Sequence, residues 1–177
     1  MSPLLGTGTI SHCILSGACR RVASNLKFPN GLVIGKDKRL YVPSSATGKI
    51  SVYDIADDYD LTLADTIDTE LPLDNLSVDS EGAIWAAAFP KGLETIKAFT
   101  AQDTWTVWQP STTGLRITRK DDGSGWRVDK VIEDNGSVLP GMTSIVHDVE
   151  TGRLFMSGVA APFIAVCEPL GYKMAAD

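Results

Sequence analysis

The chain of 177 residues carries a formal net charge of −6, which argues against nucleic acid or an anionic membrane surface as a partner. Its content of 44% hydrophobic and 21% charged residues is that of a soluble globular protein with one sizeable core. No apolar run approaches the length of about 18 residues that a membrane span needs, and residues 1–9 lack the features of a secretory signal.

Two strands are expected at the start of the chain, at residues 7–13 and 19–24. Cys13 and Cys19 face each other across a Ser16-Gly17 turn. This spacing is compatible with a disulfide across a hairpin and equally with two free buried thiols. The sequence leaves both alternatives open.

A run of strands and turns is predicted over residues 28–70, where Phe28-Pro29-Asn30-Gly31 precedes the first strand. The strands are expected at residues 32–34, 40–43, 49–54 and 61–67. The acidic stretch at residues 57–60 lacks the glycine of a calcium-binding loop, so we interpret it as a solvated turn.

The same layout returns over residues 71–134 with an insertion. Asp74-Asn75 stands at the entrance of a short apolar strand, and a tight turn at residues 80–82 leads into a second strand. That second strand, residues 83–88, is a run of small apolar residues suited to burial on both faces. Adjacent carboxylate and carboxamide groups offer the hard oxygen donors that calcium takes, although Asp and Asn also commonly cap turns.

The remaining elements are less regular. Residues 93–99 have apolar residues at both helical and strand spacing, so the pattern does not decide between the two. Outer strands of the second unit are expected at residues 114–119 and 126–132, and a weaker third copy of the layout occupies residues 135–177.

The repeat defines the expected fold. Asn30 and Asn75 are 45 residues apart, about the length of one four-stranded propeller blade. The sequence therefore predicts an all-β fold, a single partial β-propeller domain of about three blades. In this division residues 1–27 end an incomplete blade, residues 28–70 and 71–134 form two blades, and residues 135–177 form a terminal blade without its closing strand.

Four motifs at residues 28–34, 73–79, 84–86 and 135–141 together resemble the paraoxonase/arylesterase family, in that family's order. The family belongs to the gluconolactonase-like group of calcium-dependent six-bladed propellers. The resemblance covers about residues 13–167, is closer to fungal-type members than to animal ones, and implies that the chain corresponds to the C-terminal half of the propeller.

The resemblance also implies a set of site residues. Asn30, Asp74 and Asn75 would ligate the catalytic calcium ion, which polarises the carbonyl of an aryl ester or lactone, while the other ligands would come from the missing half. Phe89, where animal members carry histidine, and Ser144 are assigned to the substrate pocket.

The catalytic residues stay unassigned. The family's histidine pair lies in the absent half, and neither His12 nor His147 matches it. We interpret His147 as a turn or surface histidine rather than a base. Cys167 sits where the family has a cysteine bonded to one near its own N-terminus, and no such partner is present in this sequence.

Two functions remain in view: a calcium-dependent hydrolase of aryl esters or lactones, and a catalytically inactive truncated propeller that acts as a binding or structural module. A half-ring exposes sheet faces, so we expect a homodimer, an aggregation-prone monomer, or a missing N-terminal half as partner.

Asn135 lies in a glycosylation sequon that matters only if the protein is secreted. The compartment is left open.

Overall fold

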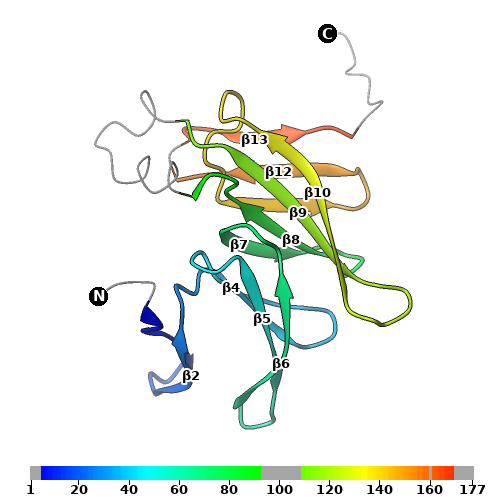
Figure 1. Ribbon diagram of the computed structural model, residues 1–177. Coiled ribbons are helices and arrows are strands. Elements are labelled where there is room, and N and C mark those ends of the chain that lie inside the picture. The colour runs from blue at the N-terminus through cyan, green and yellow to red at the C-terminus, as the bar shows by residue number, and fades with distance from the viewer. Residues whose placement is uncertain (1–4, 93–108, 160, 170–177) are drawn as a thin grey trace.

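The computed structural model describes residues 5–92, 109–159 and 161–169 and shows an all-β fold of four antiparallel sheets. The sheets stack one on another in chain order, from the N-terminal hairpin to the C-terminal sheet (Figure 1). The segment at residues 93–99, which the sequence left undecided, lies outside the described residues. No helix in the described part of the chain has the length and apolar character needed to cross a bilayer.

Each sheet is built from strands that follow one another in the sequence. The first two sheets contain β1 (Gly8–Cys13) and β2 (Cys19–Leu26), then β3 (Val33–Ile34), β4 (Leu40–Pro43), β5 (Lys49–Ile55) and β6 (Leu61–Asp68). The next two contain β7 (Leu73–Val78), β8 (Ile84–Ala88), β9 (Thr112–Arg119) and β10 (Trp126–Asp134), then β11 (Ser144–Asp148), β12 (Arg153–Ser157) and β13 (Ile164–Cys167). Stacked meanders of this kind are blades, so the predicted partial β-propeller is confirmed.

Apolar clusters fill the seams between successive sheets. Strand β8 contributes side chains to both of the larger clusters. Ile84, Ala86 and Ala88 face the β3–β6 sheet, whereas Trp85 and Ala87 face the β11–β13 sheet. This division follows from the two-residue period of a strand. All five side chains are buried, as the apolar run in the sequence predicts.

Gly114 in β9 allows a close approach in the seam toward β11. A Cβ atom at this position would lie 2.5 Å from Cγ2 of Ile132 and 2.7 Å from Cδ1 of Ile145. Only glycine fits between these side chains as they stand.

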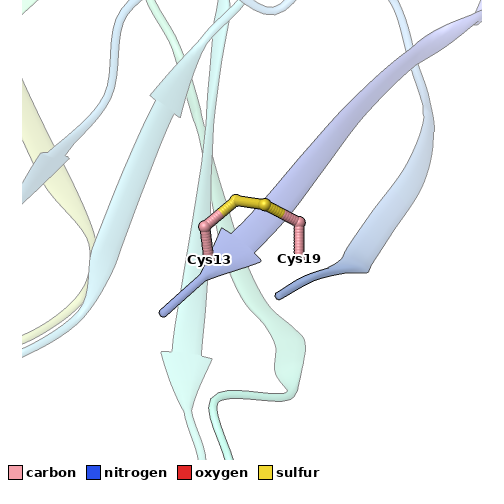
Figure 2. The surroundings of a disulfide bond; sticks show 2 residues. All are labelled: Cys13 and Cys19. Atoms are coloured by element: carbon pink, nitrogen blue, oxygen red, sulfur yellow. A yellow bond between two sulfur atoms is a disulfide. The ribbon is translucent and has the colours of Figure 1, made fainter. Parts of the chain in front are cut away.

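The N-terminal hairpin is closed by a disulfide between Cys13 and Cys19, which are paired across β1 and β2 (Figure 2). The structure thus decides between the two alternatives that the spacing left open. His12 stacks on Tyr59 with ring centroids 4.0 Å apart, and Arg20 hydrogen-bonds to Asp60. These contacts join the tips of the first two sheets.

The terminal sheet has an exposed apolar row on its outer face. Val146, Phe155 and Val166 are cross-strand partners in β11, β12 and β13, and they are 50%, 38% and 51% exposed. Ile164 beside them is 70% exposed. Cys167 is a free, half-buried thiol packed against the opposite face of the sheet, and burial raises its pKa.

Candidate functional site

The entrances of β3 and β7 bring the three residues predicted as metal ligands together. Asn30 lies just before β3, where its backbone N–H donates to the carbonyl of Pro43 at 3.0 Å. Asp74 and Asn75 lie in β7 at a bulge, because the register against β8 shifts between Leu73 and Leu76. Neighbours in a regular strand point to opposite faces, so the bulge is what lets Asp74 and Asn75 reach the same site.

These residues lie next to one another. The side chain of Asn30 interacts with the Asp74 carboxylate and acts to lower its pKa, and Nδ2 of Asn75 donates to Oδ1 of Asp74 at 3.0 Å. Gly31 closes the group from the other side: a Cβ atom on it would lie 3.0 Å from Oδ1 of Asn75. Gly31 has a φ of +40°, a conformation that favours glycine.

Both carboxamides are fixed through their nitrogen atoms. Nδ2 of Asn30 is 3.1 Å from Oγ of Ser45, which donates to the carbonyl of Leu73 at 2.6 Å. Nδ2 of Asn75 donates to the carbonyl of Thr143 at 3.0 Å. No hydrogen bond within the described residues occupies Oδ1 of either asparagine. The amide nitrogen of Asn75 therefore faces the Asp74 carboxylate, and both amide oxygens lack a donor in the described part of the chain.

Asp74 is the charged member of this cluster. Burial raises its pKa to about 6, while the hydrogen bond from Asn30 acts in the opposite direction. No lysine or arginine in the described part of the chain forms an ion pair with it. A half-buried carboxylate without a cationic partner is electrostatically unfavourable until a proton or a metal ion joins it.

The donor set fits a hard cation. Two amide oxygens and one carboxylate match the ligands that calcium prefers, and they supply three of the six to eight oxygens that it usually takes. The described residues contain no cluster of three or more His, Cys, Asp and Glu side chains of the kind that could hold a metal. The cluster is thus oxygen-rich and only partly anionic.

The two residues predicted for the substrate pocket lie at this same end of the sheets. Phe89 follows β8, is 4% exposed, and donates its backbone N–H to the carbonyl of Pro72 at 2.9 Å. Ser144 begins β11, next to Thr143, and is partly buried. Asn135 is exposed in the loop after β10, where its Oδ1 accepts from the Ser137 N–H.

His147 lies in β11, beside the end of β7 that is opposite the oxygen cluster. Its environment differs from the one expected from the sequence. It is a partly buried residue of β11, with a side chain 18% exposed, rather than a turn or surface histidine. Nδ1 lies 3.0 Å from Oδ2 of Asp79, and the ring packs 4.4 Å from that of Trp85. Burial works to raise the pKa of Asp79, but hydrogen bonds from Trp85, His147 and backbone amides outweigh it and hold the pKa below its usual value.

Sequence reasoning missed the residues that orient the ligands. Ser45 and Thr143 are ordinary polar residues in the sequence, 28 residues from Leu73 and 68 from Asn75 respectively. No local pattern distinguishes a hydroxyl or carbonyl that will orient a carboxamide in the neighbouring sheet.

Together, the stacked antiparallel sheets define a protein of the β-propeller class, and the oxygen cluster lies at one end of its sheets. In solved structures the fold recurs in a luciferin-regenerating enzyme, with a TM-score of 0.60, 18% identity and coverage of 94% of this chain and 53% of that one. It recurs also in a gluconolactonase from Xanthomonas campestris, with a TM-score of 0.58, 16% identity and coverage of 92% and 50%. At such identities the likeness concerns the fold alone.

The sequence comparison is more specific. The family model described as Arylesterase matches residues 7–168, and the chain belongs to this family. It is 32% identical over 142 residues to human serum paraoxonase/arylesterase 1, and 31% identical over 140 residues to serum paraoxonase/lactonase 3 of Oryctolagus cuniculus. These alignments cover 79% and 78% of this chain. The chain spans 38% and 37% of the length of those relatives.

Proposed function

We propose that the chain carries part of a calcium-dependent site for the hydrolysis of aryl esters or lactones, with Asn30, Asp74 and Asn75 as metal ligands. The observation that carries this proposal is the convergence of these three side chains, from two different sheets, on one oxygen-lined cluster. Family membership gives the class of substrate, since the relatives are described as arylesterase and lactonase.

The chain's own residues would hold and orient the ion. Ser45 and Thr143 hold the two amide nitrogens, which leaves both amide oxygens without a donor from the described residues and available to a cation. One carboxylate against a doubly charged ion leaves net positive charge in the site. Bound calcium supplies Lewis acidity toward a substrate carbonyl. Phe89 and Ser144, at the same end, are proposed to contact the substrate.

A second candidate function has an observation in its favour. Both histidines of the chain lie away from the cluster: His12 stacks on Tyr59, and His147 bonds to Asp79 at the other end of β7. A calcium site without a general base would bind an ester or lactone without turning it over. The alternative is therefore a catalytically inactive binding module.

Calcium binding is tested by thermal unfolding followed through tryptophan fluorescence. A site with few protein ligands binds calcium with a Kd of about 0.1–1 mM. Calcium at tenfold that concentration stabilises the fold by about 1.4 kcal/mol, which raises Tm by about 3–6 °C. Asp74→Asn removes the charge and should abolish the rise. The exposed turn variant Asp121→Asn should keep it. An equal rise in Asp74→Asn would remove the cluster from consideration.

Turnover is tested with phenyl acetate and a simple lactone, each in calcium and in a chelator. Hydrolysis that needs calcium and fails in Asp74→Asn supports the hydrolase. A calcium-dependent Tm without turnover of either substrate supports the binding module. Turnover that is unaffected by the chelator contradicts both.

A further inference from the structure

Strands β7 and β11 are joined by three side-chain hydrogen bonds that follow one rule. Each joins a residue at or near β7 to the residue 68 positions further on. The pairs are Nδ2 of Asn75 with the carbonyl of Thr143 at 3.0 Å, Oγ of Ser77 with the carbonyl of Ile145 at 2.7 Å, and Oδ2 of Asp79 with Nδ1 of His147 at 3.0 Å. We call these pairs the three rungs.

The constant offset has a geometric meaning. The two strands belong to different sheets, and an offset that stays constant means that they run parallel. Residues 75, 77 and 79 alternate and so point to one face, with rungs about 6.6 Å apart along the strand. A slip of β11 by one residue would break all three rungs together.

The Asp79–His147 rung has the largest number of supporting hydrogen bonds. The side chain of Asp79 is 1% exposed. Its Oδ1 accepts from the backbone N–H groups of Glu81 and Ala83, both at 3.0 Å, and its Oδ2 accepts from Nε1 of Trp85 at 2.8 Å. A carboxylate held by this many donors has no freedom to follow a moving partner. It therefore fixes His147 and with it the end of β11.

Apolar packing does not fix the register by itself. The cluster between these sheets includes Trp85, Met142, Ile145 and Met156, and burial of such side chains stabilises the contact without a preferred direction. Hydrogen bonds weaken steeply when their length or angle changes. The rungs and the backbone hydrogen bond from the Asn75 N–H to the Thr143 carbonyl, at 3.1 Å, therefore set where β11 sits along β7, while the apolar cluster holds the two sheets together.

We propose that Ser77 and the Asp79–His147 pair are positioning residues for Asn75. By holding the register of β11, they place the Thr143 carbonyl where it fixes Nδ2 of Asn75, and with it the orientation of this carboxamide next to Asp74. The proposed consequence for calcium affinity rests on the function proposed above. The orientation of Asn75 can be measured in the metal-free protein.

The test uses solvent exchange of the Asn75 side-chain NH₂ protons by NMR in the ¹⁵N-labelled full chain, assigned from their loss in Asn75→Asp. Ser77→Ala and His147→Ala should each raise the exchange rate about three- to tenfold, the effect of losing one hydrogen bond. His147→Asn, which keeps a donor near Nδ1, should restore slow exchange. Thr62→Ala, on the exposed side of β6, is the matched control.

Calcium titration of the same variants gives the second readout. We expect Kd to rise by a similar factor in Ser77→Ala and His147→Ala and to recover in His147→Asn. Unchanged Asn75 exchange in variants that fold normally would overturn the positioning role. Fast exchange in His147→Ala together with no calcium response in the wild type would keep the positioning role and reject the proposed function.

Discussion

The two seams on either side of the β7–β10 sheet are held in different ways. Toward β3–β6 the seam is the larger apolar cluster, which Ile50, Leu73 and Ile84 help to fill, and its side-chain hydrogen bonds are scattered, from Ser45 to Leu73, from Lys36 to Ser80 and from Trp126 to Asp65. Toward β11–β13 a smaller apolar cluster is accompanied by the three rungs along the whole of β7. Apolar burial thus holds neighbouring sheets together, and directional hydrogen bonds set the register of β11 against β7. The candidate site lies where the two seams meet.

The largest effect should come from the apolar seam. Ile84→Ala removes a side chain that is 2% exposed, and such truncations destabilise the folded state by about 2–5 kcal/mol. Urea unfolding measures the loss. Leu63→Ala, at a position 57% exposed, should change the free energy of unfolding by less than about 0.5 kcal/mol. Equal losses in the two variants would mean that this seam does not carry the stability.

The charge of Asp74 should lower the free energy of unfolding at neutral pH when no metal ion is bound. The folded-state pKa of Asp74, about 6, lies above its ordinary value, so the folded state binds the extra proton. Stability from this group is therefore present at low pH and lost as pH rises through about 6. The free energy of unfolding of Asp74→Asn should exceed that of the wild type at pH 7 and differ little from it at pH 4.

This comparison is read from urea unfolding in chelator at both pH values, because the difference between the two proteins cancels the other titrating carboxylates. Calcium should narrow the difference at pH 7 by stabilising only the wild type. A wild type that is more stable than Asp74→Asn in chelator would contradict the unfavourable burial of this charge.

Overpacking the seam toward β11 should destabilise the folded state by about 1–3 kcal/mol. Gly114→Ala places a Cβ atom against Cδ1 of Ile145 and Cγ2 of Ile132. Ile145→Val removes that Cδ1 atom, so the double variant Gly114→Ala/Ile145→Val should be more stable than the sum of the single losses predicts. Strict additivity in the double-mutant cycle would show that the two positions are not in contact.

The smallest effect belongs to the exposed contact between the hairpin tips. Arg20 and Asp60 form an ion pair with side chains 45% and 62% exposed. Arg20→Ala should lower Tm only slightly, and this loss should vanish in high salt. Thermal unfolding at two salt concentrations checks this, and a large, salt-independent loss would place this contact beside the buried rungs in importance.

The fold could be predicted because its signals are local. Alternation along single strands, turn residues and a period of 45 residues all appear within short windows, and Asp74-Asn75 is visible as a pair of adjacent oxygen donors. The anchoring of those donors could not be predicted. Thr143 and His147 gain their roles from the register of strands in different sheets, and alternation within one strand carries no information about its position along another.

The outer face of the terminal sheet has a practical consequence for assays. The row of Val146, Phe155 and Val166 presents apolar surface to solvent in the native state. Dyes that fluoresce on contact with such surface will bind the folded chain as well as the unfolded one, so their signal will start high and change little on heating. Emission from Trp85, which is buried between two sheets, reports unfolding without this background.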